Sequence, residues 1–88
     1  MDDPYVLDAN AVAGEIAELL GVELTTTLHR CAHCGNGAPM GTLRAWTGGP
    51  GVVLRCSTCA EVVMRWVRTP DGVRLDVRGA AFLRLSVG

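Results

Sequence analysis

The sequence predicts a small α+β domain stabilised by a bound metal, in which one helix precedes a set of antiparallel strands. Three observations lead to this class. The 88 residues contain four cysteines in two C-x2-C pairs, an apolar period of helical spacing covers residues 8–20, and short runs typical of strands fill residues 24–78 and 80–87. A chain of this length forms one domain, here residues 1–88, whose apolar core alone gives marginal stability. A metal would therefore supply a cross-link that the core needs.

Residues 8–20 are expected to form the only helix of the domain. Asp8 or Asn10 can cap its start, acidic residues crowd the early turns, and Gly21 supplies the stop. The apolar residues that fall close to one helix face are Leu7, Val12, Ile16, Leu19 and Leu20. We expect this stripe to pack on the domain itself, with docking on a partner as the alternative.

After Gly21 the residue types favour β structure. The expected strands are residues 25–30, 42–46, 52–55, 61–68 and 73–78, and residues 80–87 are expected to form a closing strand or an extended tail. Thr69-Pro70-Asp71-Gly72 predicts a reverse turn that joins the last two of these strands as a hairpin. Apolar and charged residues alternate through 73–78, which predicts a half-buried strand.

The two cysteine pairs predict one tetrahedral metal site. The expected ligands are Cys31, Cys34, Cys56 and Cys59, with 21 residues between the pairs. Two residues between cysteines let one tight turn direct both sulfur atoms at the same ion, and a second such turn completes the tetrahedron. We expect a single structural Zn²⁺ ion, and iron held by the same four sulfur atoms is the less favoured alternative.

Other uses of the cysteines fit the sequence less well. A disulfide framework needs an oxidising compartment, whereas the first residues contain no secretory signal, so we expect reduced thiols and a cytoplasmic location. A redox C-x-x-C normally begins a helix, but residues 35–39 disfavour helix and residues 60–64 favour strand. His29 and His33 lie near the first pair, and either would be a ligand only in a mixed site.

The charge is divided along the chain although the formal net charge is −1. Residues 1–23 contain six acids and no base, whereas residues 24–88 contain three acids and all eight basic residues, each of them an arginine. Arg30 and Arg55 directly precede the first cysteine of each pair. We expect both to be solvated, and partial neutralisation of the thiolate charge is the alternative.

Two cysteine turns on antiparallel hairpins resemble the zinc ribbon fold group, over roughly residues 24–78. Residues 5–14 and 73–83 are similar to the corresponding ends of a family of short, uncharacterised bacterial zinc-ribbon proteins. The resemblance implies that the four cysteines are the ribbon ligands, and it brings no established activity. Gly35 matches the small residue that commonly follows the first turn. Ala60 departs from the glycine often found after the second turn, so we expect that turn to be less regular.

Two functions without catalysis follow from these features. The leading expectation is a protein-interaction adaptor or regulatory subunit that docks through a sheet edge or the helix, since balanced charge and small size suit that role. The alternative is a nucleic-acid-binding module, in which arginines neutralise phosphates and an aromatic ring stacks on an unpaired base. Its candidate residues are Arg44, Trp46, Arg55, Arg74 and Arg78, whereas Trp66 is expected in the core.

An enzyme is not expected from this sequence. Four cysteines close the coordination shell that a catalytic zinc leaves open, and no catalytic triad or phosphate-binding loop is present. A chain this short also leaves little room for a small-molecule substrate. A rubredoxin-like iron electron carrier remains the second alternative. The apolar runs are far shorter than the roughly 20 residues that span a bilayer, so no membrane association is expected.

Overall fold

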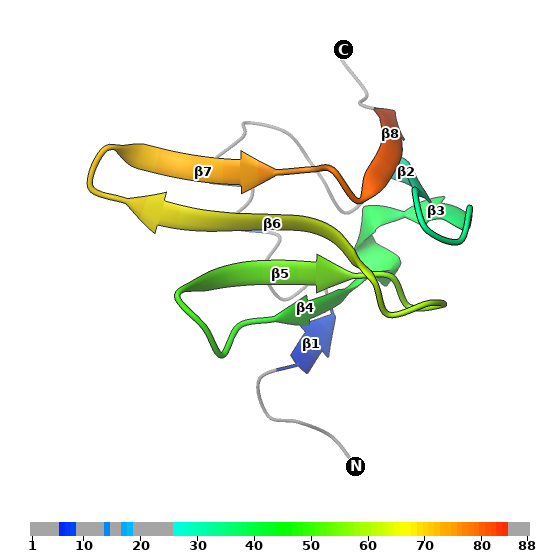
Figure 1. Ribbon diagram of the computed structural model, residues 1–88, viewed down its shortest axis with the longest axis horizontal. Helices are drawn as coiled ribbons and strands as arrows, with labels where there is room; N and C mark the ends of the chain where they lie inside the picture. The colour runs from blue at the N-terminus through cyan, green and yellow to red at the C-terminus, as the bar shows by residue number, and fades with distance from the viewer. Residues whose placement is uncertain (1–5, 9–13, 15–16, 19–25, 85–88) are drawn as a thin grey trace.

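The computed structural model describes residues 6–8, 14, 17–18 and 26–84 (Figure 1). The described residues form an all-β structure of two antiparallel sheets, with one short 3-10 turn, η2 (Met40–Thr42). The strands are β1 (Val6–Asp8), β2 (Leu28–Cys31), β3 (Gly37–Pro39), β4 (Arg44–Trp46), β5 (Gly51–Arg55), β6 (Val62–Thr69), β7 (Gly72–Asp76) and β8 (Ala80–Arg84). The larger sheet has the order β1-β4-β5-β6-β7 and the smaller sheet the order β3-β2-β8.

The expected α+β class is wrong for the described residues. Asp8, expected to cap the helix, belongs instead to β1, where the register places it opposite Arg44 of β4. Leu7, a residue of the expected helical stripe, lies opposite Ala45. Short apolar runs fit helical and strand spacing alike, so the sequence pattern could not separate the two. The rest of residues 8–20 lies outside the described residues, except positions 14, 17 and 18, whose backbone is helical but which define no element.

The expected strands correspond to β2, β4, β5, β6 and β7, with small shifts at their ends, and the closing strand corresponds to β8. The hairpin between β6 and β7 closes through Pro70 and Asp71, with Thr69 opposite Gly72. Gly72 has a φ of +143°, a conformation that glycine adopts without a steric penalty. The expected turn is therefore confirmed, whereas β1 and β3 were not anticipated.

The alternation in β7 is present, but its expected half-buried character is wrong. Val73 and Leu75 of β7 are 40% and 43% exposed, and Val77, directly after the strand, is 38% exposed. Leu75 lies opposite Trp66, so this apolar row is on the same side of the larger sheet as the core. It extends beyond the core because β7 is the edge strand of that sheet.

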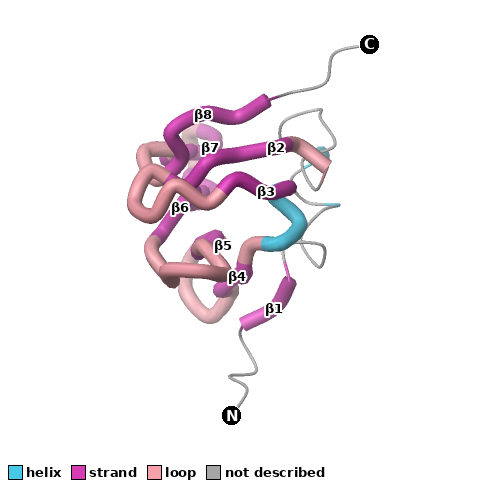
Figure 2. Tube along the Cα trace, turned by 90° about the vertical axis from the view of Figure 1, so that its right-hand side faces the viewer, coloured by secondary structure: helices cyan, strands magenta, loops and turns pink. Residues whose placement is uncertain are grey.

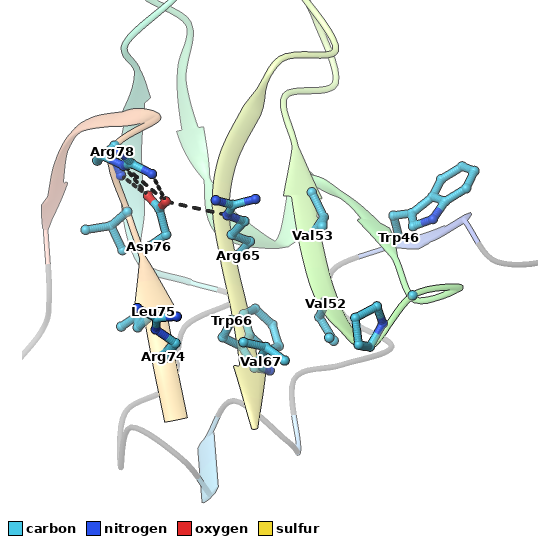
Figure 3. Close-up of a pocket in the computed structure, with 14 residues that line it drawn as sticks. Trp46, Val52, Val53, Arg65, Trp66, Val67, Arg74, Leu75, Asp76 and Arg78 are labelled. Carbon is cyan, nitrogen blue, oxygen red and sulfur yellow. Dashed lines mark hydrogen bonds and ion pairs between the residues drawn. The ribbon is translucent and has the colours of Figure 1, made fainter. Parts of the chain in front are cut away.

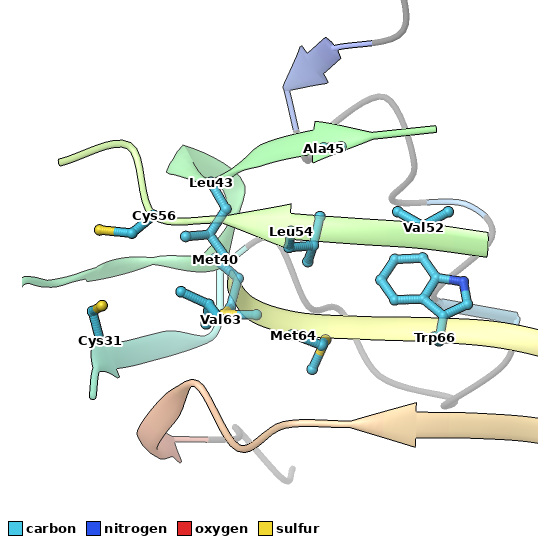
Figure 4. Packing of buried hydrophobic residues seen from close by; sticks show 10 residues of the cluster. All are labelled: Cys31, Met40, Leu43, Ala45, Val52, Leu54, Cys56, Val63, Met64 and Trp66. Atoms are coloured by element: carbon cyan, nitrogen blue, oxygen red, sulfur yellow. The ribbon is translucent and has the colours of Figure 1, made fainter. Parts of the chain in front are cut away.

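The core lies between one face of the larger sheet, the smaller sheet and η2 (Figures 2 and 4). Met40 and Leu43 pack there with Leu54, Met64 and Trp66, and each of these side chains is at most 3% exposed. Burying side chains of this size stabilises the fold by about 1.5–3 kcal/mol each. Cys31 and Cys56 belong to the same buried cluster, so the apolar core continues directly into the cysteine site.

A row of buried residues on β4, β5 and β6 sets which face of the larger sheet is covered. Ala45 is opposite Leu54, Leu54 is opposite Met64, and Val52 is opposite Trp66. Because side chains alternate along a strand, the residues between them lie on the opposite, open face. The described residues contain no helix long and apolar enough to cross a membrane.

Candidate metal centre

All four cysteines come together where the β2–β3 and β5–β6 connections meet, on one side of the molecule (Figure 1). Cys31 ends β2 and Cys34 lies in the turn after it, while Cys56 follows β5 and Cys59 precedes β6. Their Sγ atoms all lie within 4.8 Å of one another. The structure therefore brings the expected ligand set into one group that could hold a metal ion.

The sulfur spacing fits a metal centre and excludes disulfides. The Sγ atoms of Cys31 and Cys59 are 3.7 Å apart, as are those of Cys34 and Cys56. A disulfide requires about 2.05 Å, and all four cysteines are free. Four sulfur atoms arranged tetrahedrally at about 2.3 Å from an ion would be separated by about 3.8 Å. These two sulfur–sulfur distances thus match the edge of such a tetrahedron.

The two cysteine turns repeat one hydrogen-bonding pattern. In each, the amide after the second cysteine donates to the carbonyl of the first cysteine, and the amide of the first cysteine donates to the carbonyl two residues after the second. The donor and acceptor residues are Gly35 to Cys31 and Cys31 to Asn36 in one turn, and Ala60 to Cys56 and Cys56 to Glu61 in the other, each at 2.9 Å. Both turns are therefore closed by their own backbone.

Gly35 and Ala60 occupy the same place in the two turns and share a left-handed backbone, with φ values of +79° and +66°. Ala60 is the only non-glycine with a positive φ among the described residues. Ala60 stands where glycine is often found, and its positive φ is strained because the Cβ atom makes this region costly for an L-residue. The expected irregularity of the second turn is wrong, since its hydrogen bonds equal those of the first.

Arg30 and Arg55 fasten these turns. The Nη1 atom of Arg30 donates to the carbonyl of Gly35, and that of Arg55 donates to the carbonyl of Ala60, both at 3.0 Å. Both arginines are exposed, as expected, but neither is simply solvated. Each places a guanidinium group beside a cysteine turn, where its charge opposes that of the thiolates.

The thiols ionise unequally. Burial opposes ionisation of Cys56, but the amides of Cys59 and Thr58, the latter 3.4 Å from Sγ, outweigh it and lower the pKa of Cys56 to about 7. The amide of Glu61 favours the Cys59 thiolate, yet burial and the neighbouring thiols raise the pKa of Cys59 to about 12. Several thiolates at this spacing repel one another without a cation. Metal binding would therefore displace protons from the cluster.

The two histidines lie outside the cysteine group. His33 is exposed in the first turn. His29 is buried on β2, with Nδ1 2.6 Å from the carbonyl of Ala38. Because a carbonyl only accepts, Nδ1 carries the proton and donates it. The Nε2 atom of His29 is buried without a hydrogen-bond partner. Among the described residues the metal-competent group consists of the four cysteines and includes neither histidine.

The nucleic-acid candidates gather on the open face of the larger sheet. The register places Arg44 opposite Arg55, Trp46 opposite Val53, and Val67 opposite Arg74. Arg65, opposite Val53, points the same way and was not among the candidates. We call the surface formed by Arg44, Trp46, Arg55, Arg65, Arg74 and Arg78 the basic face; Figure 3 shows Trp46, Arg65, Arg74 and Arg78. Arg65 could have been found from its place between buried Met64 and Trp66, which forces it to the open side.

An open groove of about 750 Å³ covers part of this face, where Trp46, Val53, Arg65, Val67 and Arg78 line it (Figure 3). Val52, Trp66 and Leu75 also line the groove, whereas Arg44 and Arg55 do not. Trp46 is 38% exposed, whereas Trp66 is 3% exposed and in the core, as expected.

Asp76 is the acid of this groove, and it is already held by arginine. Its carboxylate accepts from Nε and Nη2 of Arg78, the latter at 2.6 Å, and lies 3.5 Å from Nε of Arg65. These contacts hold the pKa of Asp76 well below its usual range, the hydrogen bond from the Arg78 side chain contributing most. The arginines of the basic face therefore outnumber its acid, and the groove favours anions.

Fold and site together define a small β domain with a four-cysteine cluster that could hold a metal ion. A four-cysteine set closes the coordination shell, which is the chemistry of structural rather than catalytic sites. The chain belongs to the DUF6510 family, described as a family of unknown function, whose model matches residues 2–88. Comparisons with curated proteins and with solved structures give no match.

Proposed function

We propose that the four cysteines hold one structural Zn²⁺ ion. Three features support this: a donor set of four thiols, two sulfur contacts of 3.7 Å, and backbone-closed turns that fix the cysteines. Such an ion would link β2 of the smaller sheet to β5 and β6 of the larger one. Iron in the same site, as in an electron carrier, is the competing occupant.

Metal analysis and the visible spectrum of the purified protein test this proposal. We expect one zinc per chain and no visible absorption. Cys34→Ser and Cys59→Ser should each lose the metal, while His33→Ala, a change inside the same cluster of turns, should retain it. A coloured protein containing iron would overturn zinc, and metal loss in His33→Ala would overturn the four-cysteine ligand set.

We propose further that the domain is a binding module for single-stranded nucleic acid and that the basic face is its binding surface. One observation carries this: the strand register places four of the five candidates, together with Arg65, on one face. Guanidinium groups there can neutralise phosphates, and the exposed ring of Trp46 can stack on a base. Single strands are favoured over duplexes because stacking on Trp46 needs an unpaired base.

Docking on a protein partner, as an adaptor or regulatory subunit, is the alternative proposal. Small size and balanced charge suit docking on a protein, but this function does not explain why the arginines and Trp46 share the basic face. A protein partner is therefore the interpretation that follows if nucleic acid fails to bind. Electron transfer depends on iron and is tested by the visible spectrum described above.

Fluorescence anisotropy with labelled single-stranded RNA and DNA, across a salt series, tests the nucleic-acid proposal. We expect affinity to fall steeply with salt, Arg65→Ala to reduce the salt slope by about one, and Trp46→Ala to weaken binding by about 1–3 kcal/mol for one stacked base. Arg84→Ala is the matched control, because Arg84 lies on β8 of the other sheet. Binding that is insensitive to salt, or equal losses in Arg65→Ala and Arg84→Ala, would overturn the proposal.

A further inference from the structure

We propose that β7 pairs with β7 of a second copy of this chain, antiparallel and centred on Leu75, so that two larger sheets join into one. The inference rests on the edge of the sheet and is independent of the metal and of nucleic acid. It assigns the exposed apolar row of β7 a partner of defined sequence.

Among the described strands, β7 is the edge best suited to pairing. The two sheets end at β1, β7, β3 and β8. β3 contains Pro39, which has no N–H to donate, and β1 has three residues. β8 carries a single charged residue, Arg84, with no acid to complement it. β7 has five residues, and apolar and charged side chains alternate over the last four, Val73 to Asp76.

The backbone of β7 presents its free groups at the required positions. In an antiparallel ladder, alternate pairs exchange hydrogen bonds, and residues of the other pairs direct their N–H and C=O groups outward. The pair that flanks a two-residue turn, here Thr69 and Gly72, is a bonded pair. Bonded and non-bonded pairs alternate from there, so the backbones of Trp66 and Leu75 do not exchange hydrogen bonds with each other. The N–H and C=O groups of Leu75 therefore point away from β6. A second copy centred on Leu75 would meet those groups.

The charges select this register. With Leu75 opposite Leu75, Arg74 of each copy lies opposite Asp76 of the other, and two ion pairs form across the joint. A shift of the centre to Arg74 or to Asp76 would place like charges directly opposite, which is destabilising. Asp76 already accepts from the backbone N–H and the side chain of Arg78 and lies 3.5 Å from Nε of Arg65, which together use its roughly four acceptor positions. Arg74 of the second copy would therefore meet this carboxylate as an opposite charge in place of the longer contact from Arg65.

The same register also pairs the exposed apolar side chains of the two copies with one another. Val73 would lie opposite Val77 of the second copy, and Leu75 opposite its own equivalent, covering side chains that are 38–43% exposed. The row continues the core side of the sheet, next to Trp66, so pairing extends an existing apolar surface. Pairing would also set the two basic faces side by side, because both lie on the opposite side of the joined sheet.

Sedimentation equilibrium of the metal-loaded protein, freed of nucleic acid, tests the pairing. We expect a concentration-dependent dimer. Arg74→Asp gives a strand with two acids, and Asp76→Arg gives a strand with two arginines, so each variant alone should dimerise at least tenfold more weakly. Mixing the two variants should restore dimers, because each charge then meets its opposite. Arg84→Asp, a reversal on β8, should dimerise like the unmodified protein.

Three results would overturn the proposal. They are a monomer at all concentrations, an Arg74→Asp variant that dimerises as well as the unmodified chain, and a mixture that fails to associate. Since Asp76→Arg also removes contacts to Arg78 and Arg65, its metal content and circular dichroism verify that it is folded before mixing. The Arg74→Asp result decides the matter if Asp76→Arg does not fold.

Discussion

Ala60 holds a backbone conformation that glycine reaches freely, with a φ of +66°. An L-residue in this conformation costs about 1–2 kcal/mol. Replacing it by glycine removes that cost, but glycine loses more backbone entropy on folding, which offsets part of the stabilisation. Ala60→Gly should therefore raise the free energy of unfolding by about 0.5–1 kcal/mol in urea titrations of the metal-loaded protein. Ala32→Gly, at an exposed position of the first turn without a positive φ, is the control and should not stabilise. No gain in Ala60→Gly would contradict the strain assigned to this residue.

Asp76 predicts a pH dependence whose sign follows from its arginine contacts. Folding lowers the pKa of Asp76, and the hydrogen bond from the Arg78 side chain is the largest cause. The ionised carboxylate therefore stabilises the fold at pH values above its unfolded pKa of about 3.9. That contribution is lost as the pH falls below this value. The stability difference between the native chain and Asp76→Asn should be constant from about pH 7 to 5 and shrink below about 4.

Urea titrations across this pH range measure that difference, and Asp71→Asn in the β6–β7 turn is the charge-matched control. Because metal release at low pH affects both proteins, the comparison rests on their difference. A difference that grows as the pH falls would show that the assigned sign is wrong.

The segment between β7 and β8 is fixed by Gly79, which lies against β6 and the first cysteine turn. Its carbonyl accepts from the amide of Ala32 at 2.9 Å. A Cβ atom there would overlap the carbonyl of Val62 and come within 2.6 Å of Cα of Val63, all of them backbone atoms that cannot rotate away. Gly79→Ala should therefore lower the free energy of unfolding by about 1–3 kcal/mol or more.

Thermal or urea unfolding checks the Gly79 prediction, and Gly49→Ala is its control. Gly49 lies in the β4–β5 connection with no atom within 4 Å of an added Cβ. That variant should stay within about 0.5 kcal/mol of the unmodified protein. Equal stability of the two variants would mean that the close approach at Gly79 is relieved without loss.

Among the structural elements, turns and hairpins could be predicted from the sequence, whereas the pairing of strands far apart in the chain could not. The cysteine turns and the β6–β7 hairpin were predictable because spacing and turn residues lie within a few positions of one another. β1 was not, because its pairing with β4 joins segments far apart in the chain and its residues also fit a helical period. Arg65 was not among the candidates, although the expected burial of the adjacent Trp66 places it on the open side of its strand.

For the molecule as a whole, the metal is expected to decide whether the two sheets stay together. Apparent binding energies of structural zinc are on the order of 10–16 kcal/mol, comparable with the entire stability of a small domain. Removing the metal with a strong chelator should therefore unfold or loosen the chain and shift the emission of buried Trp66 to longer wavelength.

The variant Trp46→Phe isolates the Trp66 signal for this measurement, and adding zinc back should restore it. Unchanged emission after verified metal removal would contradict a structural role for the ion. The cluster of four cysteines could be predicted from spacing alone, but the shared surface of arginines and Trp46 could not, since it depends on the register of four strands.

The matched closure of the two cysteine turns has a consequence for how an ion is captured. Arg30 and Arg55 each donate to a carbonyl of the adjacent cysteine turn, so each turn is held by contacts within its own segment. Metal binding would then join two locally closed cysteine turns instead of ordering four separate side chains, and the conformational entropy lost on binding would be correspondingly smaller.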